Sequence, residues 1–205
     1  MAAMTTGSVS RADVNRRRIL EVALTELLRD PDASMDQIAR AAGVVRRTVY
    51  GHFPSREALI STLVDGAVAA VAAAHRTGSE AAADPAEAVA RSTLAVWEVA
   101  DRYRILVALA QRSVTVQGIR DRLAPVRDAC ARTLAHGLEQ GVFVSPLPPQ
   151  VLAYLHEQML FALMETVNEG LLGTREAGRS AAVTLLTTAG VPASRATALV
   201  AELTD

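Results

Sequence analysis

The chain has 205 residues and is 50% hydrophobic, so it is long enough to bury a core and too apolar for a disordered protein. It carries 21 basic and 22 acidic residues, so any nucleic-acid surface must be local. Cys130 is the single cysteine, which excludes a disulfide framework and a cysteine-based zinc site. The longest apolar run, residues 67–74, is too short for a membrane span, and residues 1–20 lack the apolar stretch of a signal peptide. We therefore expect a cytoplasmic protein.

Apolar residues recur at helical spacing along most of the chain, and no segment alternates with the composition of a strand. We therefore predict an all-α fold. A polar tail, residues 1–14, precedes the first helix, which ends where Pro31 interrupts the pattern. The predicted helices span residues 15–28, 34–42, 45–53, 55–75, 86–101, 104–112, 119–140, 148–171, 175–189 and 193–203.

Residues 34–53 have the layout of a helix-turn-helix. Ser34 and Gln37 have the spacing of a capping box, and Gly43 provides the left-handed backbone that a tight turn needs. Apolar side chains are spaced so that the two helices pack together. The second helix presents five side chains that can bond to base edges or phosphate oxygens: Arg46, Arg47, Thr48, Tyr50 and His52.

Positive charge is concentrated in the same region. Residues 44–56 contain three arginines and no acidic residue, and residues 16–18 form a second arginine cluster at the start of the first helix. The alternative reading is a helical hairpin with ordinary solvated arginines. Because turn, cap, core and charge agree in the 44–56 segment, we favour nucleic-acid binding there.

The stretch from Ala42 to Leu59, AGVVRRTVYGHFPSREAL, resembles the signature of the TetR family of bacterial transcriptional regulators. The family pattern is Ala-Gly-Val-Ser-x-x-Thr-x-Tyr-x-His-Phe-x-Ser-Lys-Glu-x-Leu, and the resemblance covers roughly residues 15–65. It implies a three-helix DNA-binding head, which we place at residues 15–57, and a helical body at residues 58–205. It also implies a homodimer that binds a double-stranded DNA operator and is released by a small molecule.

The resemblance implies base reading by Arg46 and Arg47. It implies further DNA contacts, mostly to the backbone, at Ser34, Thr48, Tyr50, His52 and Arg56.

Three features depart from the family pattern. Val45 replaces the serine that caps the recognition helix, Gly51 offers no side chain, and the connector at residues 29–33 is short. We expect the first two changes to affect the DNA contacts and the operator preference, and all three to leave the fold intact.

The body carries weaker signals. The helix at 148–171 is apolar over much of its circumference, and the helix at 175–189 carries small residues, so we predict that both pair with a second subunit as a four-helix bundle. The alternative is that both are simply core. We read His75 as an electrostatic cap at a helix end and Cys130 as a small buried hydrophobe.

An effector pocket is predicted between the helices at 86–101, 119–140 and 148–171, for a small and largely apolar molecule. Plain packing is the commoner role for each lining candidate taken alone. The candidates are Trp97, His136, His156, Met159 and Phe161, with Tyr103 and Cys130 as further possibilities.

No phosphate-binding loop, nucleophile elbow or zinc motif is present in the sequence, so we expect no catalytic residue, metal or cofactor. The predicted function is a dimeric transcriptional regulator, a repressor, that binds a palindromic operator and is released by a small effector. A DNA-binding regulator without an effector is the main alternative, and a helical enzyme is the more remote one.

Overall fold

The computed structural model describes residues 10–113 and 116–204, and this part of the chain is helical and contains no strand. The all-α prediction is therefore confirmed. The helices are α1 (Arg11–Arg29), α2 (Met35–Ala41), α3 (Arg46–His52), α4 (Arg56–Glu80), α5 (Pro85–Ser113), α6 (Val116–Glu139), α7 (Pro149–Asn168), α8 (Thr174–Thr188) and α9 (Ala193–Glu202).

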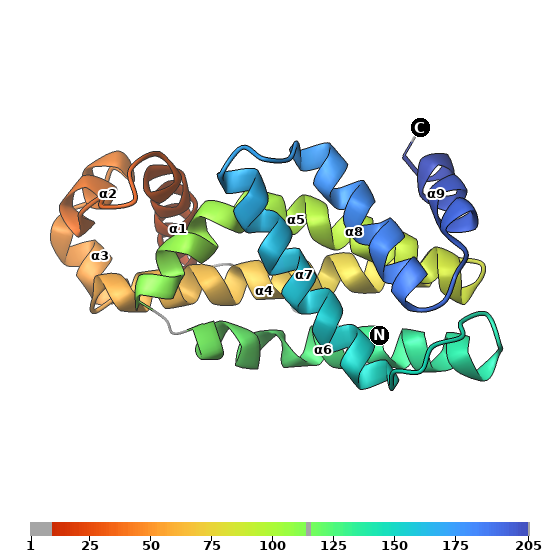
Figure 1. Ribbon diagram of the computed structural model, residues 1–205. Helices are drawn as coiled ribbons and strands as arrows, with labels where there is room; N and C mark the ends of the chain where they lie inside the picture. Colours follow the sequence, from red (N-terminus) through yellow and green to blue (C-terminus); the bar gives the residue numbers. More distant parts are fainter. Residues whose placement is uncertain (1–9, 114–115, 205) are drawn as a thin grey trace, which may run out of the picture.

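The helices form a small head and a larger body (Figure 1). Helices α1–α3, which we call the head, gather at one end of the molecule. Helix α4 leads out of the head and runs along the body, with α5 and α6 on either side of it. Helix α7 crosses this layer, and α8 and α9 complete the end far from the head. The long α4 therefore joins the two parts directly.

Several helix boundaries differ from those predicted. Helix α1 begins at Arg11 because the hydroxyl of Ser10 caps it, accepting a hydrogen bond from the Asp13 amide at 3.2 Å. Residues 10–14 of the predicted tail thus belong to this helix and its cap, whereas residues 1–9 lie outside the described part. Helix α4 continues to Glu80, through part of the predicted loop, since no proline interrupts it.

The predicted helices at 86–101 and 104–112 are one continuous helix, α5. No glycine or proline separates them, so the backbone hydrogen bonds continue. Helix α6 begins at Val116 and contains both Gly118 and Pro125, although Gly118 was predicted to precede it. The prediction was wrong here because a single glycine within a helix costs only about 1 kcal/mol, which packing readily offsets.

Apolar residues at helical spacing hold the head together. Ile19, Ala23 and Leu27 lie one turn apart on α1, and they are at most 1% exposed. They pack in one cluster with Val49 of α3 and with Phe53, which ends that helix. Full burial of a side chain of this size stabilises a fold by roughly 1.5–3 kcal/mol, so these contacts fix the relative positions of the short helices α2 and α3.

Helix α4 takes part in the cores of both head and body. Leu59 and Ile60 are fully buried in the head cluster, and His75 is buried about four turns further on. In the described part of the chain, α4 is one helix whose length and mean hydropathy would allow it to cross a membrane. Helix α4 packs against α5, α6 and α1, and 28% of this apolar window is buried.

The closest approach between α4 and α5 depends on Gly78. A Cβ atom at this position would lie 2.7 Å from the Cα atom of Ser92, and the backbone of Arg91 is equally near. The two helices can therefore lie backbone to backbone only because residue 78 has no side chain. Gly66, on the same helix, has open space around its Cα atom.

We expect Gly78→Ala to destabilise the protein by about 1–3 kcal/mol, because α5 must move away from α4 to admit the methyl group. Gly66→Ala is the matched control. It should stabilise the protein by about 0.5–1 kcal/mol, since alanine has the better helix propensity and meets no neighbour. Urea unfolding of the two variants measures both effects. Equal stability changes in the two variants would contradict the close-contact explanation.

Candidate nucleic-acid interface and internal cavity

Helix α2 is capped by local hydrogen bonds, and a glycine turn joins it to α3. The Ser34 hydroxyl accepts from the Gln37 amide at 3.2 Å, and the Gln37 side chain accepts from the Ser34 amide at 2.7 Å, which confirms the predicted capping box. Gly43 has a φ of +66°, as the predicted turn requires. Val45 precedes α3 without any side-chain cap, in agreement with the expected loss.

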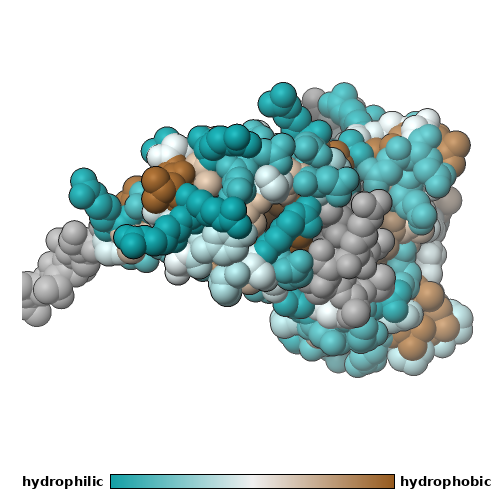
Figure 2. All heavy atoms as spheres, turned by 90° about the vertical axis from the view of Figure 1, so that its left-hand side faces the viewer, coloured by the Kyte–Doolittle hydropathy of each residue, from teal (hydrophilic) through white to brown (hydrophobic). Residues whose placement is uncertain are grey.

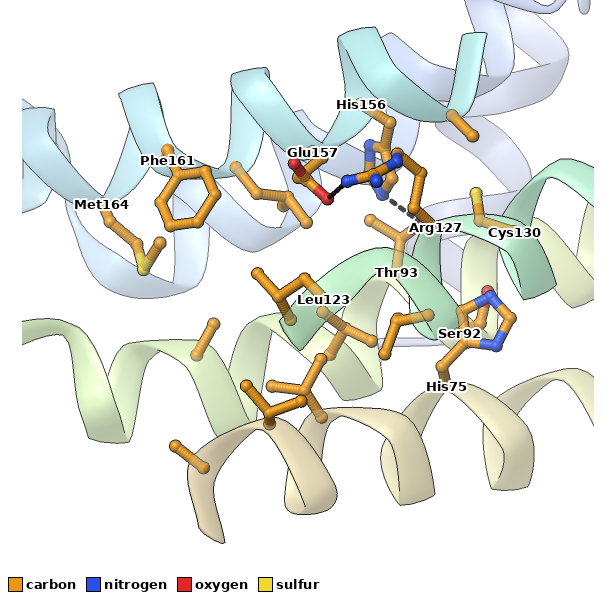
Figure 3. Close-up of a pocket in the computed structure, with 18 of the residues that line it drawn as sticks. His75, Ser92, Thr93, Leu123, Arg127, Cys130, His156, Glu157, Phe161 and Met164 are labelled. Atoms are coloured by element: carbon orange, nitrogen blue, oxygen red, sulfur yellow. Dashed lines mark hydrogen bonds and ion pairs between the residues drawn. The ribbon is translucent and has the colours of Figure 1, made fainter. Parts of the chain in front are cut away.

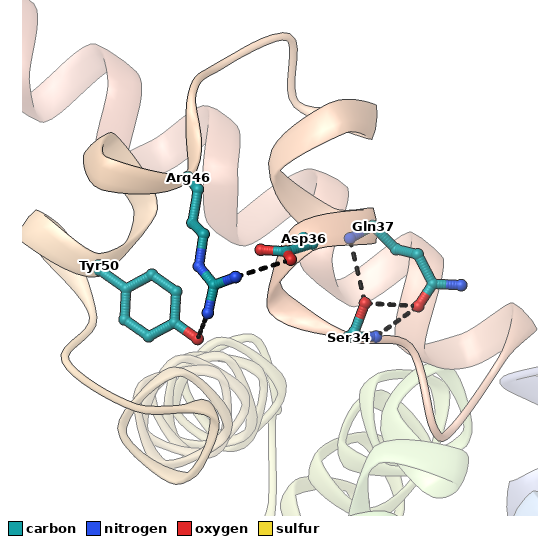
Figure 4. Close-up of polar contacts among 5 residues, drawn as sticks. All are labelled: Ser34, Asp36, Gln37, Arg46 and Tyr50. Carbon is teal, nitrogen blue, oxygen red and sulfur yellow. Dashed lines mark hydrogen bonds and ion pairs between the residues drawn. The ribbon is translucent and has the colours of Figure 1, made fainter.

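Arg46 is held by its neighbours on the outer surface of the head (Figure 4). Its guanidinium donates to the Asp36 carboxylate at 3.0 Å, which ties α3 to α2. The same group lies over the Tyr50 ring, 5.1 Å from Cζ to the ring centroid, and donates weakly to the Tyr50 hydroxyl at 3.5 Å. Arg46 therefore has two protein partners in the absence of DNA.

Arg47 differs from Arg46 in having an open environment. Its side chain is exposed and forms no hydrogen bond or ion pair with any described residue. Thr48 and His52, on the same helix, are half-buried. Figure 2 shows the molecule from the head end, where hydrophilic residues cover most of the visible head. Of the arginines on α3, Arg47 is thus the one available to an incoming ligand.

The arginine cluster at residues 16–18 packs partly against the helix-turn-helix. Arg16 lies over the Phe53 ring, 5.4 Å from Cζ to the centroid, and the guanidinium of Arg18 lies beside Gly43. Arg17 is exposed. These contacts bring the positive charge of α1 close to the turn. The two arginine clusters, which are separate in the linear sequence, therefore lie close together in the fold.

Arg56, the first residue of α4, makes internal contacts. Its guanidinium donates to the carbonyl oxygens of Pro31 and Ala33, the latter at 3.3 Å, and so joins α4 to the connector between α1 and α2. Ser55 caps the helix by accepting from the Ala58 amide at 3.1 Å. The structure thus places the Arg56 side chain against the head's own backbone, and Ser34 is likewise engaged in its cap.

An internal cavity of about 110 Å³ lies between α4, α5, α6 and α7 (Figure 3). His156 and Phe161, both predicted to line a pocket, do line it. Two further possibilities, Tyr103 and Cys130, also contribute to the lining. Most of the remaining lining is aliphatic.

Three predicted pocket residues lie elsewhere. Trp97 is buried under α8, where its indole N–H donates to the Thr174 carbonyl at 2.8 Å. Met159 packs against the core of the body, and His136 is exposed and bonded to Gln140. Sequence periodicity places residues on a helix but does not show which side of that helix faces the cavity.

Sequence reasoning missed His75 as a lining residue. The predicted helix ended there, which favoured a capping role, but α4 continues five residues further and buries the imidazole. Burial lowers the pKa of His75, and the nearby charge of Arg132 lowers it further. The interpretation of His75 as a terminal cap was therefore wrong.

The other titratable groups of this region are either neutral, because they are buried, or joined in an ion pair. It lowers the pKa of His156 to about 3, with a smaller effect from His75, and raises the pKa of the Cys130 thiol to about 12. Cys130 is thus a small buried hydrophobe, as predicted. Arg127 and Glu157 form an ion pair at 2.7 Å that joins α6 to α7 at the cavity wall.

Comparisons with known proteins identify the family. Residues 19–63, which contain the capping box, turn and α3, match the family model described as "Bacterial regulatory proteins, tetR family". The chain is 36% identical over 96 residues to the HTH-type transcriptional regulator EthR of Mycobacterium tuberculosis, covering 40% of this chain and 44% of EthR. The chain therefore spans less than half the length of the curated relatives it matches.

Solved structures extend the likeness over the whole fold. FadR from Bacillus halodurans matches with a TM-score of 0.74 at 18% identity, covering 87% of this chain and 97% of that one. LfrR from Mycobacterium smegmatis, in complex with proflavine, matches with a TM-score of 0.68 at 19% identity, covering 87% and 98%. Fold and matched motif together define a helix-turn-helix regulatory protein. Residues 19–63 belong to the TetR family of bacterial regulatory proteins, which the sequence resembles.

The internal contacts of Arg56 lead to a stability prediction. We expect Arg56→Ala to destabilise the protein by about 1–2 kcal/mol, since two hydrogen bonds from a charged donor are lost. Arg17→Ala, which removes an exposed arginine without such bonds, should change stability by less than about 0.5 kcal/mol. Urea unfolding measures both. An unchanged stability for Arg56→Ala, together with a flatter salt dependence of DNA binding, would instead indicate a phosphate contact.

Proposed function

We propose that this protein is a cytoplasmic transcriptional repressor that binds a palindromic operator as a homodimer and is released by a small, largely apolar effector. The observation that carries the DNA-binding part is the exposed face of α3, held on a capped helix-turn-helix within a segment that matches the TetR family model. The proposal assigns no catalytic residue.

The contacts on α3 support different roles for the individual residues that we propose to bind DNA. Arg47 is open and can bond bidentately to a guanine edge. Arg46, restrained by Asp36 and Tyr50, can reach DNA only by exchanging one of these partners. Thr48, Tyr50 and His52 add hydroxyl and imidazole groups suited to phosphate oxygens. Ser34 and Arg56 would contribute mainly by holding the hairpin in place.

The DNA-binding proposal is tested by selecting duplexes from a random library and measuring gel shifts with the enriched site. We expect a pseudo-palindromic sequence, because a two-fold dimer presents its recognition helices to two equivalent half-sites. Arg47→Ala should weaken binding by about 1–3 kcal/mol and relax the preference at one base position in each half-site.

The matched control for Arg47→Ala is Arg195→Ala, which removes an exposed arginine from α9 in the body. It should leave operator affinity unchanged. Unchanged binding in the double variant Arg46→Ala, Arg47→Ala would contradict the assignment of α3 as the recognition helix.

The dimer proposal is supported by an apolar exposed face on α7. Val151, Tyr154 and Leu155 lie on adjacent turns and are 40–44% exposed. Helix α8 also remains part of the proposed four-helix bundle, through its outer face. Leu185 does not belong to that face, because it is 3% exposed and lies in the core of the body. The small residues of α8 are also buried inside the protomer: Ala177, Ala181 and Ala182.

We expect Leu155→Asp to yield a folded monomer, since a carboxylate is costly to bury in a dry subunit interface. The monomer should also lose operator affinity. Val14→Asp, which alters an equally exposed aliphatic residue on α1, should remain dimeric. Sedimentation analysis measures both, and a dimeric Leu155→Asp variant would exclude this face of α7 from the interface.

Hydrogen bonds made by two arginines connect the helices around the cavity to the head. Arg122 on α6 donates to Asp65 at 2.7 Å and to Ser61 at 2.9 Å, both on α4. Arg56 then ties the first turn of α4 to the head. A molecule that displaces α6 would pull on α4 through these bonds and change the placement of the head. The effector part of the proposal is further supported by LfrR, whose structure holds proflavine.

A further inference from the structure

The cavity between α4, α5, α6 and α7 has walls that distinguish among chemical classes of ligand. Its surface is almost wholly apolar, with aliphatic residues from all four helices. A volume of about 110 Å³ is far more than a single water needs and is close to that of apolar cavities of about 150 Å³ that bind benzene. The walls thus fit a molecule with a small apolar or aromatic body.

The two histidines of the cavity lie at one end of it (Figure 3). His75 on α4 and His156 on α7 lie there, with Thr93 of α5 and Cys130 of α6 nearby, whereas Phe161 and Met164 lie toward the other end. The cavity is therefore apolar along most of its length, with the two imidazoles at one end.

Both imidazoles carry an unsatisfied nitrogen. His75 and His156 are 8% and 9% exposed, and Nε2 of His75 and Nδ1 of His156 have no hydrogen-bond partner. The other nitrogen of His156 meets the Thr93 hydroxyl at 3.4 Å, which is long for a hydrogen bond. Buried polar atoms are normally paired, so a ligand hydroxyl that reached either nitrogen would satisfy it.

Among the residues whose side chains are described, none offers the cavity an unpaired charge. Burial keeps both imidazoles and the Cys130 thiol neutral, and the Arg127 guanidinium is already bonded to Glu157. A carboxylate or an ammonium group would therefore lose its hydration without gaining a counter-ion, which is unfavourable. A hydroxyl group can both donate and accept, so it suits a neutral imidazole in either tautomer.

We propose that the cavity binds an uncharged phenol or alcohol, with its hydroxyl group at the His75–His156 end and its apolar body toward Phe161 and Met164. This assignment rests on the proposed function, because it specifies the chemical class of the effector. It excludes fatty acids, other carboxylates and organic cations from the cavity.

The experiment compares three probes of one shape by titration calorimetry on the full chain without DNA. They are para-cresol, para-xylene, in which a methyl replaces the hydroxyl, and para-toluate, in which a carboxylate does. We expect para-cresol to bind and para-toluate to show no binding. His156→Leu should reduce the preference for para-cresol over para-xylene about tenfold, the effect of losing one buried hydrogen bond. Comparing the cresol-to-xylene affinity ratio between the wild-type protein and the variant cancels the difference in hydrophobicity between the two probes.

Two further variants keep the experiment decisive. His136→Leu, on the outside of α6, should leave both affinities unchanged. If His156→Leu fails to fold by circular dichroism, Thr93→Val tests the same polar end with little change in shape. Tighter binding of para-toluate than of para-cresol would overturn the proposal, as would an unaltered cresol-to-xylene ratio or the failure of all three probes to bind.

Gel shifts with the selected operator separate this inference from the proposed function. If para-cresol binds in the expected way but no operator is found, the ligand class stands and the repressor function fails. If the operator binds and the cresol preference is absent, the repressor function stands and the ligand class fails.

Discussion

Helix α4 is buried at both of its ends, and this double packing constrains the rest of the structure. Leu59 and Ile60 complete the core of the head, while Gly78 allows α5 to pack directly on the backbone of α4. The buried cluster continues from the head along α4 to Leu106 of α5 and Ile119 of α6. The head therefore cannot shift relative to the body without disturbing a shared core, which makes α4 suited to transmit a change from the cavity to the DNA-binding surface.

The arginines of the head illustrate how one residue type takes different roles. Arg16 and Arg46 lie over aromatic rings, Arg56 bonds to backbone carbonyls, and Arg47 is open. Each restrained guanidinium has less side-chain freedom to lose on binding, because it is already ordered. The positive surface near the turn is thus partly pre-organised before any DNA arrives.

The cavity and the exposed apolar face of α7 follow from the distribution of apolar residues on α7 and α8. Small residues such as Ala181 let α8 pack closely inside the protomer, whereas Val151, Tyr154 and Leu155 remain on the outside of α7. Between α7 and α4 the larger side chains do not fill the space. The cavity that remains is lined in part by two neutral imidazoles. One helix, α7, therefore serves the core, the cavity and the exposed apolar face.

The sequence by itself determined the helical class, the capping box at Ser34, the positive φ of Gly43 and the exposed position of Arg47. These features depend on hydrogen bonds and side-chain directions within a few residues, so local pattern is sufficient to find them. The tertiary structure decided that Arg56 bonds to Pro31 and Ala33, that Leu185 lies in the core, and that His75 lines the cavity whereas Trp97 does not. Each of these outcomes depends on contacts between helices distant in the chain, because the way helices cross decides which side of each one is buried.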